Sequence, residues 1–262
     1  MEPSNNTGVL IICHGSKNNR WNDLVDEAVG DITLPYDIPV VCSFLEEVVE
    51  GRCIQDGIDE LEGRGITHII VVPLFVSSGS THMDEIHYAL GAQSNPTIPT
   101  DLQPFRMKAQ MTLCDPLDDH PIVAEMIAAK IQPVIHQPEK EIIILVGHGS
   151  NESGFKEKWE QGMRSVASQV KERSHVKAVD IALLLPDQLP STLSKWKKEE
   201  PNCDITVVPL FLSKGYFINQ VIPSRISTIS CRYIEQAMLP DPLITAWMEQ
   251  QIKDAIRTQS LV

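Results

Sequence analysis

A histidine follows a continuous apolar run at two places in the chain. The first run, Val9–Cys13, leads directly into His14, and the second, Ile142–Val146, leads into His148 one glycine later. Both histidines are followed by Gly-Ser. Such runs are typical of buried parallel strands, whose carboxyl ends are where open α/β sheets bind ligands. Neutral imidazole is a base near neutral pH and a ligand for Fe, Co and Ni, so both positions are candidates for metal chemistry. The repetition itself indicates an internal duplication.

Two further side chains in the first half suit the same chemistry. Glu46 follows a predicted strand at Val40–Leu45, and His82 lies in a loop after a predicted strand at His68–Val76. Because the carboxyl ends of parallel strands share one edge of a sheet, we expect both side chains to approach His14. Two imidazoles and one carboxylate, with positions left open, would hold a divalent ion loosely enough to release it.

Each candidate also has an ordinary structural interpretation. A histidine after a buried strand is often a turn residue that bonds to backbone. Glu46 stands beside Glu47, and either carboxylate could be plain surface charge. Glu85, three residues after His82 on the same predicted helical face, fits a second carboxylate near the ion but is more simply a solvated charge.

The second half is less complete. His148 is retained, but Phe217 stands where the duplication would place the second histidine, and the second strand ends in Leu185-Pro186 with no glutamate. One histidine makes a poor metal site. We therefore interpret this half as a degenerate copy, in which Phe217 or Tyr216 could still pack against the flat face of a ligand.

Strands and helices alternate in both halves. Between the apolar runs lie segments with helical spacing, such as Ile54–Arg64, and each half follows the order β-α-β-α-β-α-β-α. This order predicts an α/β fold with two similar halves, each a mostly parallel four-stranded sheet with helices on both faces. We expect the halves at residues 1–132 and 141–262, joined by a proline-punctuated linker at 133–140, and the working site in the first half.

Composition excludes several classes of protein. The 262 residues carry a formal net charge of −13, which disfavours nucleic acid and anionic membranes as partners. The six cysteines are scattered without a Cys-x-x-Cys pair, which disfavours zinc knuckles, iron–sulfur clusters and disulfide scaffolds. No stretch approaches the roughly 18 apolar residues of a membrane helix, and the polar start Met1–Thr7 lacks a signal-peptide pattern. We expect a cytoplasmic protein.

Taken in order, these motifs resemble the CbiX/SirB family of sirohydrochlorin chelatases in its long form with two homologous halves. The resemblance rests on strand-His14-Gly-Ser, on Ser43-Phe-Leu-Glu46, on Val72-Pro-Leu-Phe-Val followed by a histidine loop, and on Asp115-Pro-Leu. It covers nearly the whole chain, and the order and spacing of the motifs are more specific than any one of them.

The resemblance implies two flavodoxin-like halves that face each other across a cleft. It also implies insertion of Fe²⁺ or Co²⁺, and in some members Ni²⁺, into a tetrapyrrole without ATP, towards sirohaem or cobalamin. The implied roles make His14 and His82 the metal-binding and proton-accepting pair and Glu46 the third metal ligand. The expected partners are sirohydrochlorin and the divalent metal substrate, with no further cofactor. A monomer is expected, since one chain supplies both walls of the cleft.

Two alternatives remain open at this point. The chain could be a non-catalytic protein that binds a tetrapyrrole or a metal ion on the same fold, with turnover lost through the altered loop Gly79–His82. A hydrolase built on the Gly-His-Gly-Ser phrase ranks lower, because the sequence has no Gly-x-Ser-x-Gly elbow.

Overall fold

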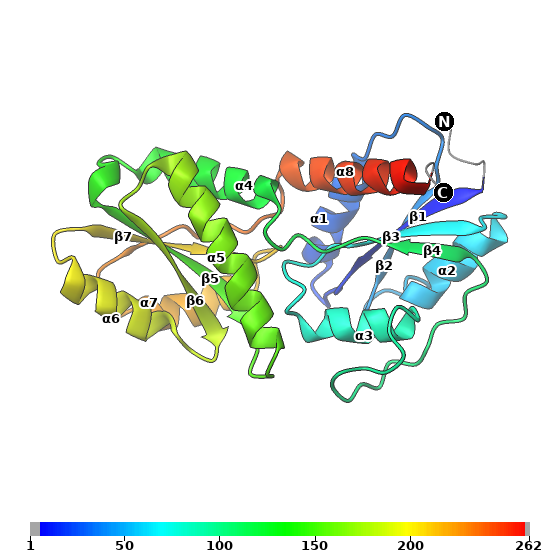
Figure 1. Cartoon of the computed structure of the whole chain (residues 1–262), viewed down its shortest axis with the longest axis horizontal. Helices are drawn as coiled ribbons and strands as arrows, with labels where there is room; N and C mark the ends of the chain where they lie inside the picture. Colours follow the sequence, from blue (N-terminus) through cyan, green and yellow to red (C-terminus); the bar gives the residue numbers. More distant parts are fainter. Residues whose placement is uncertain (1–5, 260–262) are drawn as a thin grey trace. The chain divides into compact units, whose positions relative to one another are not determined.

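The structure is a computed structural model that describes residues 6–259. Residues 1–5, which include most of the polar start discussed above, and residues 260–262 lie outside the described part. The described chain divides into two compact units, each built on its own four-stranded sheet (Figure 1).

The first unit contains seven consecutive elements and the C-terminal helix. They are β1 (Thr7–Cys13), α1 (Asn19–Gly30), β2 (Val40–Phe44), α2 (Ile54–Gly63), β3 (His68–Pro73), α3 (Thr81–Ala89), β4 (Gln110–Leu113) and α8 (Pro242–Gln259). Its strands lie in the order β2-β1-β3-β4, and all neighbours are parallel. The strand β1 is central, and all seven of its residues are buried, as the unbroken apolar run predicts.

Helices cover both faces of this sheet (Figure 1). Side chains of α2 and α3, among them Ile58 and Ile86, pack with Leu10 and Ile12 of β1 in one core cluster. The helices α1 and α8 contact each other, and α8 also contacts β3. Burial of each such aliphatic side chain contributes about 1.5–3 kcal/mol, so the sheet is held from both sides by the hydrophobic effect.

The second unit repeats this architecture. Its elements are α4 (Pro121–Ile131), the 3₁₀ turns η1 (Gln132–Val134) and η2 (Pro138–Lys140), β5 (Glu141–Gly149), α5 (Phe155–Ser174), β6 (Ala178–Leu185), α6 (Leu189–Glu199), β7 (Asp204–Pro209), a π-helical turn η3 (Phe217–Val221), α7 (Ile222–Ile226) and β8 (Arg232–Tyr233). The strands lie in the order β6-β5-β7-β8 and are again all parallel. The predicted fold class, two similar parallel α/β halves, is confirmed.

The compact units differ from the predicted halves 1–132 and 141–262 in their last helices. The helix α4, which ends the first repeat, packs against α5 of the second unit. The helix α8, which ends the second repeat, packs in the first unit, where Thr245 Oγ1 donates to Ala28 O at 2.9 Å and Thr33 N donates to Glu249 Oε1 at 2.8 Å. The two repeats thus exchange their final helices. An apolar helical face indicates that a helix is buried but not which sheet buries it.

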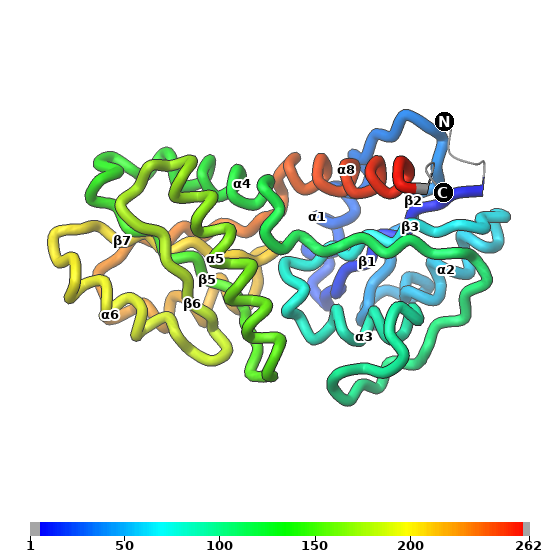
Figure 2. The backbone as a smooth tube through the Cα atoms, viewed as in Figure 1, coloured from blue at the N-terminus to red at the C-terminus, as the bar shows by residue number. Residues whose placement is uncertain are grey.

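A long connection without regular structure joins α3 to β4 in the first unit (Figure 2). The buried Asp84 of α3 holds it: its carboxylate accepts hydrogen bonds from Gln93 Nε2 at 2.9 Å, Thr97 N at 2.7 Å and Thr97 Oγ1 at 2.6 Å. Burial on its own would raise the pKa of Asp84, but these hydrogen bonds outweigh it and hold the pKa below its ordinary value.

Within residues 6–259, none of the helices has both the length and the apolar character needed to cross a membrane.

Candidate functional site

The chain turns sharply where it leaves β1. Cys13 ends the strand, His14 follows, and Gly15 adopts a positive φ of 84°. A Cβ at Gly15 would also lie 2.8 Å from Val48 Cγ2 and 2.9 Å from Phe44 Cβ. Only glycine meets both demands, so the glycine after the histidine is what brings the imidazole to the sheet edge.

The ring of His14 is held through one nitrogen. Its Nδ1 lies 2.8 Å from Gly15 O. A carbonyl oxygen can only accept a hydrogen bond, so in the neutral ring Nδ1 carries the hydrogen and Nε2 keeps its lone pair. That lone pair is available to a metal ion or to a proton.

Glu46 reaches His14 because the chain continues to pair with β1 after β2 ends. Leu45 N donates to Cys13 O at 2.8 Å, and Glu46 N donates to His14 O at 3.0 Å. The carboxylate oxygen Oε1 of Glu46 lies 3.9 Å from His14 Nε2, and both side chains are about half exposed. The expected approach of Glu46 to His14 is therefore present in the structure.

His82 also lies beside His14. The two ring centroids are 4.6 Å apart, with the rings inclined at 66° in an edge-to-face arrangement. His82 is the second residue of α3 rather than a loop residue as expected, because the helix begins at Thr81. Three side chains from three separate segments of the sequence, His14, Glu46 and His82, thus meet at the carboxyl edge of one sheet.

Glu85 holds the second imidazole. Its Oε2 lies 3.2 Å from His82 Nδ1, one turn along α3. A carboxylate that accepts from Nδ1 leaves the lone pair on Nε2, as the carbonyl does for His14. Glu85 is therefore not the plain solvated charge that was the simpler of its two interpretations; it contacts His82 from the helical face that their i, i+3 spacing predicted.

The arrangement stops short of a formed metal centre. Among residues 6–259, no three histidine, cysteine, aspartate or glutamate side chains are grouped closely enough to hold a metal ion as they stand. His14 is the common neighbour of the other two candidates. The assignment of His14, Glu46 and His82 as metal ligands stays a prediction.

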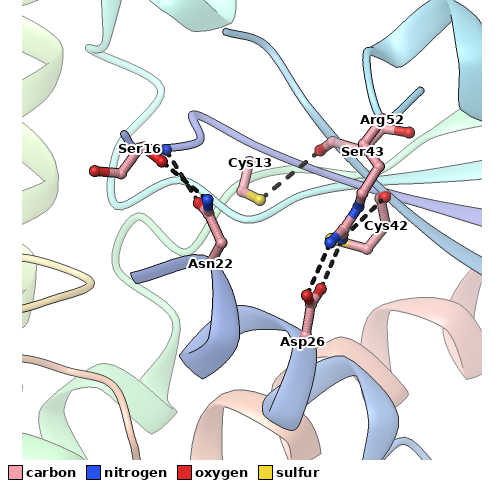
Figure 3. Close-up of polar contacts among 7 residues, drawn as sticks. All are labelled: Cys13, Ser16, Asn22, Asp26, Cys42, Ser43 and Arg52. Atoms are coloured by element: carbon pink, nitrogen blue, oxygen red, sulfur yellow. Dashed lines mark hydrogen bonds and ion pairs between the residues drawn. The ribbon is translucent and has the colours of Figure 1, made fainter. Parts of the chain in front are cut away.

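One residue that fixes the loop after His14 escaped the sequence analysis. Asn22 of α1 is buried; its Nδ2 donates to Ser16 O at 2.9 Å, and its Oδ1 accepts from Ser16 N at 3.1 Å (Figure 3). A polar residue among apolar helix positions was the available signal.

The second unit repeats the first half of this geometry. His148 Nδ1 lies 3.0 Å from Gly149 O, and Gly149 has a φ of 78°. The partner ring is Phe217, whose centroid lies 4.8 Å from that of His148 at an interplanar angle of 83°. Phe217 therefore occupies the place that His82 has in the first unit, as the duplication predicted. It stacks on Phe211 at 5.5 Å, and the neighbouring Tyr216 is 65% exposed.

Comparison with known proteins gives relatives for both repeats. The CbiX family pattern matches residues 8–134 and again 142–255. A sirohydrochlorin cobaltochelatase of Methanococcoides burtonii is 24% identical over 133 residues, which is 50% of this chain and 99% of that protein. The sirohydrochlorin cobaltochelatase of Saccharolobus solfataricus is 25% identical over 124 residues, 47% of this chain and 92% of that protein.

Solved structures resemble the whole chain. SirB from Bacillus subtilis with Fe³⁺ superposes with a TM-score of 0.74 at 18% identity and covers 97% of each chain. CbiX, described as the terminal enzyme for biosynthesis of siroheme in denitrifying bacteria, gives a TM-score of 0.60 at 16% identity and covers 95% of this chain and 99% of its own. At these identities the likeness establishes the fold. The family pattern matches most of the sequence, once in each repeat, and the chain therefore belongs to the CbiX family.

Proposed function

We propose that this protein is a sirohydrochlorin chelatase that inserts a divalent metal ion, Fe²⁺ or Co²⁺, into the tetrapyrrole. The observation that carries the proposal is the edge-to-face pair of His14 and His82, 4.6 Å apart, with Glu46 3.9 Å from His14. Family membership and the chelatase names of its relatives support the same reaction.

The reaction exchanges one divalent cation for two protons. The free macrocycle carries hydrogen on two of its four central nitrogens, and both must leave as the metal enters. A catalyst therefore needs ligands that hold the cation briefly and bases that accept protons near neutral pH. Two imidazoles with Nε2 unprotonated meet both needs in turn, because the lone pair that releases the ion is then free to take a proton.

The roles follow from the contacts. His14 and His82 would bind the incoming ion through Nε2 and then accept the ring protons. Glu46 would add a negative charge, so that the site would bind the cation more tightly than the two neutral imidazoles would alone. Glu85 would keep His82 in the tautomer with Nε2 free, since its carboxylate already accepts from Nδ1.

Several finer points belong to the same proposal. No step above requires ATP, since the binding of the metal by four ring nitrogens drives the exchange. Imidazole and carboxylate suit Fe²⁺ and Co²⁺ and also admit Ni²⁺. The duplication favours a monomer, and six unpaired cysteines favour a reducing compartment such as the cytoplasm.

The alternative is a protein of the same fold that binds a tetrapyrrole or a metal ion without turnover. The test is anaerobic incubation of the protein with sirohydrochlorin and Fe²⁺, Co²⁺ or Ni²⁺, followed by the absorbance change of the macrocycle. The proposal predicts that insertion with at least one metal is faster than in the protein-free control. The variant His82→Ala should lose most of this rate while it still binds sirohydrochlorin, measured by fluorescence quenching.

Two results would contradict the proposal. If the unaltered protein binds sirohydrochlorin but accelerates insertion of none of the three metals, the non-catalytic alternative is correct. If His82→Ala retains the full rate, the reaction does not use the histidine pair.

A further inference from the structure

The connection from β3 to α3 leads directly into the candidate site. Its last five residues, the loop Val76–Ser80, end where α3 begins at Thr81, and His82 follows as the second residue of the helix. The first amides of a helix have no partner within that helix, so contacts outside it help to hold the first turn in place. Whatever holds this loop therefore helps to place His82 beside His14.

Asp118, in the segment between β4 and α4, holds the loop through its carboxylate. Its Oδ1 accepts hydrogen bonds from Ser78 N at 2.8 Å and from Ser78 Oγ at 3.2 Å. The backbone closes the contact from the other side, because Asp118 N donates to Val76 O at 3.0 Å. One residue thus binds the loop both through its side chain and through its main chain.

The rest of the loop is tightly folded and closely packed. Gly79 N donates to the buried Ser77 Oγ at 3.0 Å, and Ser80 N donates to Ser77 O at 3.0 Å. A Cβ at Gly79 would lie 2.6 Å from Phe155 O and 2.8 Å from Trp159 N, so the loop backbone lies directly against the start of α5. By this packing the loop belongs with Asp118 to the second compact unit, and the chain returns to the first unit with α3.

The backbone and the charge of Asp118 are both unusual. Its φ is 40°, in the left-handed region that residues other than glycine seldom adopt, although aspartate tolerates it better than most. Burial raises the pKa of the Asp118 carboxyl, and the hydrogen bonds from Ser78 and Ser77 only partly oppose this effect. Backbone strain of this kind persists where the surrounding structure imposes it, and it is concentrated at functional sites.

The duplication offers an internal comparison. The phrase Asp115-Pro-Leu-Asp118 corresponds to Asp241-Pro-Leu-Ile244 in the second repeat, so a fully buried isoleucine stands in place of this carboxylate. The second repeat is also the one that has Phe217 in place of the second imidazole. The carboxylate therefore accompanies His82 rather than the fold.

We propose that Asp118 is a positioning residue for the metal site. Its carboxylate fixes the loop Val76–Ser80, and the loop in turn fixes His82 at the start of α3. In this role Asp118 contacts neither the metal ion nor the tetrapyrrole. The proposal rests on the proposed function, because His82 is a ligand and a base only if the protein is a chelatase.

Three variants separate the effect of the carboxylate from that of the backbone. Asp118→Gly removes the carboxylate and supplies a residue that adopts a positive φ freely. Asp118→Asn keeps an oxygen that can accept from Ser78 N, and asparagine tolerates the same backbone conformation. Asp119→Gly is the matched control, since it makes the same change at the exposed neighbouring position.

Hydrogen–deuterium exchange of the full chain, followed by mass spectrometry, measures the loop without turnover. Asp118→Gly should speed exchange of the amides of Ser78–Ser80 by about tenfold, because the loss of a hydrogen bond lets the loop open more often. Asp118→Asn and Asp119→Gly should stay within about twofold of the unaltered protein.

Metal binding and turnover then measure the effect on the site. Asp118→Gly should raise the Kd for Co²⁺ and the KM for the metal by about tenfold, and the KM for sirohydrochlorin should stay within about twofold. A merely structural loss of folded protein would lower the rate and leave both KM values unchanged. In a His82→Ala background, Asp118→Gly should have no further effect on the Kd for Co²⁺, because the side chain that it positions is absent.

The proposal is overturned if Asp118→Gly leaves the exchange of the loop or the affinity for Co²⁺ unchanged, since the buried Met83 and Ile86 would then hold α3 without help. An equal loss of affinity with and without His82 would overturn it as well. If the unaltered protein binds Co²⁺ but inserts no metal, the chelatase assignment fails instead, and exchange and Co²⁺ binding still decide the role of Asp118. An unaltered protein that binds no Co²⁺ overturns the metal site and this role together.

Discussion

Each candidate imidazole is held by one ring nitrogen and presents the other. His14 is fixed by the carbonyl of Gly15, which the fold supplies in both repeats, and His82 is fixed by the carboxylate of Glu85, which only the first repeat has. The backbone contact therefore comes with the strand-His-Gly turn, and the side-chain contact is specific to this site. A ligand whose other nitrogen is already committed binds metal in one defined tautomer.

Glu85 contacts His82 but is not itself a proposed metal ligand. It can therefore be substituted without removing a ligand from the site. In Glu85→Gln the amide oxygen can still accept from His82 Nδ1, but without charge. We expect the rate of metal insertion to fall by about tenfold, with sirohydrochlorin binding unchanged. The exposed Glu172 of α5 gives the control Glu172→Gln, which should be silent. Equal rates for the two variants would show that Glu85 does not support the site.

His68 gives the protein a pH dependence of stability away from the site. It begins β3, and its Nε2 lies 2.9 Å from Thr112 Oγ1 of β4. Burial lowers the pKa of His68, partly opposed by a hydrogen bond with Gln110. The unfolded chain, with a histidine pKa of about 6.5, therefore binds the proton before the folded chain does. The stability contributed by neutral His68 is present above about pH 6.5 and is lost as the pH falls through the lower folded value.

The measurement is urea unfolding of the wild type and of His68→Gln at about pH 7 and about pH 5, on either side of the ordinary histidine pKa. Between these two values, the wild type should lose more stability than the variant, in which residue 68 does not titrate. Identical losses would contradict the assignment of a lowered pKa to His68.

At the scale of elements, close approach of helix and strand decides where glycine is needed. A Cβ at Gly57 of α2 would lie 2.3 Å from Ser43 Oγ and 2.7 Å from Leu10 Cδ1, whereas a Cβ at Gly63 of the same helix would have no neighbour within 4 Å. The helix α2 thus packs through Gly57 onto the two strands that lead to His14 and Glu46.

The two glycines form a matched pair for mutation. Gly57→Ala should destabilise the protein by about 1–3 kcal/mol through overpacking, despite the better helix propensity of alanine. Gly63→Ala, which changes only that propensity, should stabilise it by up to about 1 kcal/mol. Thermal unfolding followed by circular dichroism distinguishes them. A gain in stability for both would mean that α2 does not pack closely at Gly57.

The sequence predicted those elements whose pattern is local. The apolar run of β1 and the turn at Gly15 follow from residue types alone, and so does the equivalence of His82 and Phe217 once the repeat is recognised. The contact of Glu85 with His82 depends on a rotamer, and the two hydrogen bonds between Asn22 and Ser16 depend on the path of a loop. The i, i+3 spacing places Glu85 on the same helical face as His82 but does not by itself fix the contact, and no spacing predicts the contact of Asn22 with Ser16. The exchange of α4 and α8 escaped for a different reason, because both helices offer an apolar face that suits either sheet.

At the scale of the whole molecule, the two units share the strand-His-Gly turn, but only the first unit pairs two imidazoles beside it. The first unit keeps both imidazoles, and the second keeps the turn at Gly149 and the ring pair but has Phe217 in place of one imidazole. The geometry of the second unit survives because an aromatic ring of similar size fills the same space and stacks on Phe211.

One substitution would give the second unit the same pair of side chains as the first. Phe217→His would place a second imidazole beside His148, about where the first unit has His82. We expect the variant to add a second, weaker Co²⁺-binding event in anaerobic calorimetry, since paired imidazoles bind such ions and one alone binds poorly. Phe217→Leu controls for the loss of aromatic packing and should add none. If Phe217→His binds no additional cobalt, the second unit has lost more than one ligand.

The most direct test of a single working site compares the two equivalent histidines. Initial rates of anaerobic metal insertion into sirohydrochlorin are measured for His14→Ala and His148→Ala beside the unaltered protein. The two substitutions remove the same side chain from the same turn, each held by the following carbonyl. His14→Ala should lose at least about 100-fold in rate, and His148→Ala should stay within about twofold of the unaltered protein. Equal losses, or a larger loss for His148→Ala, would contradict the assignment of the site to the first unit.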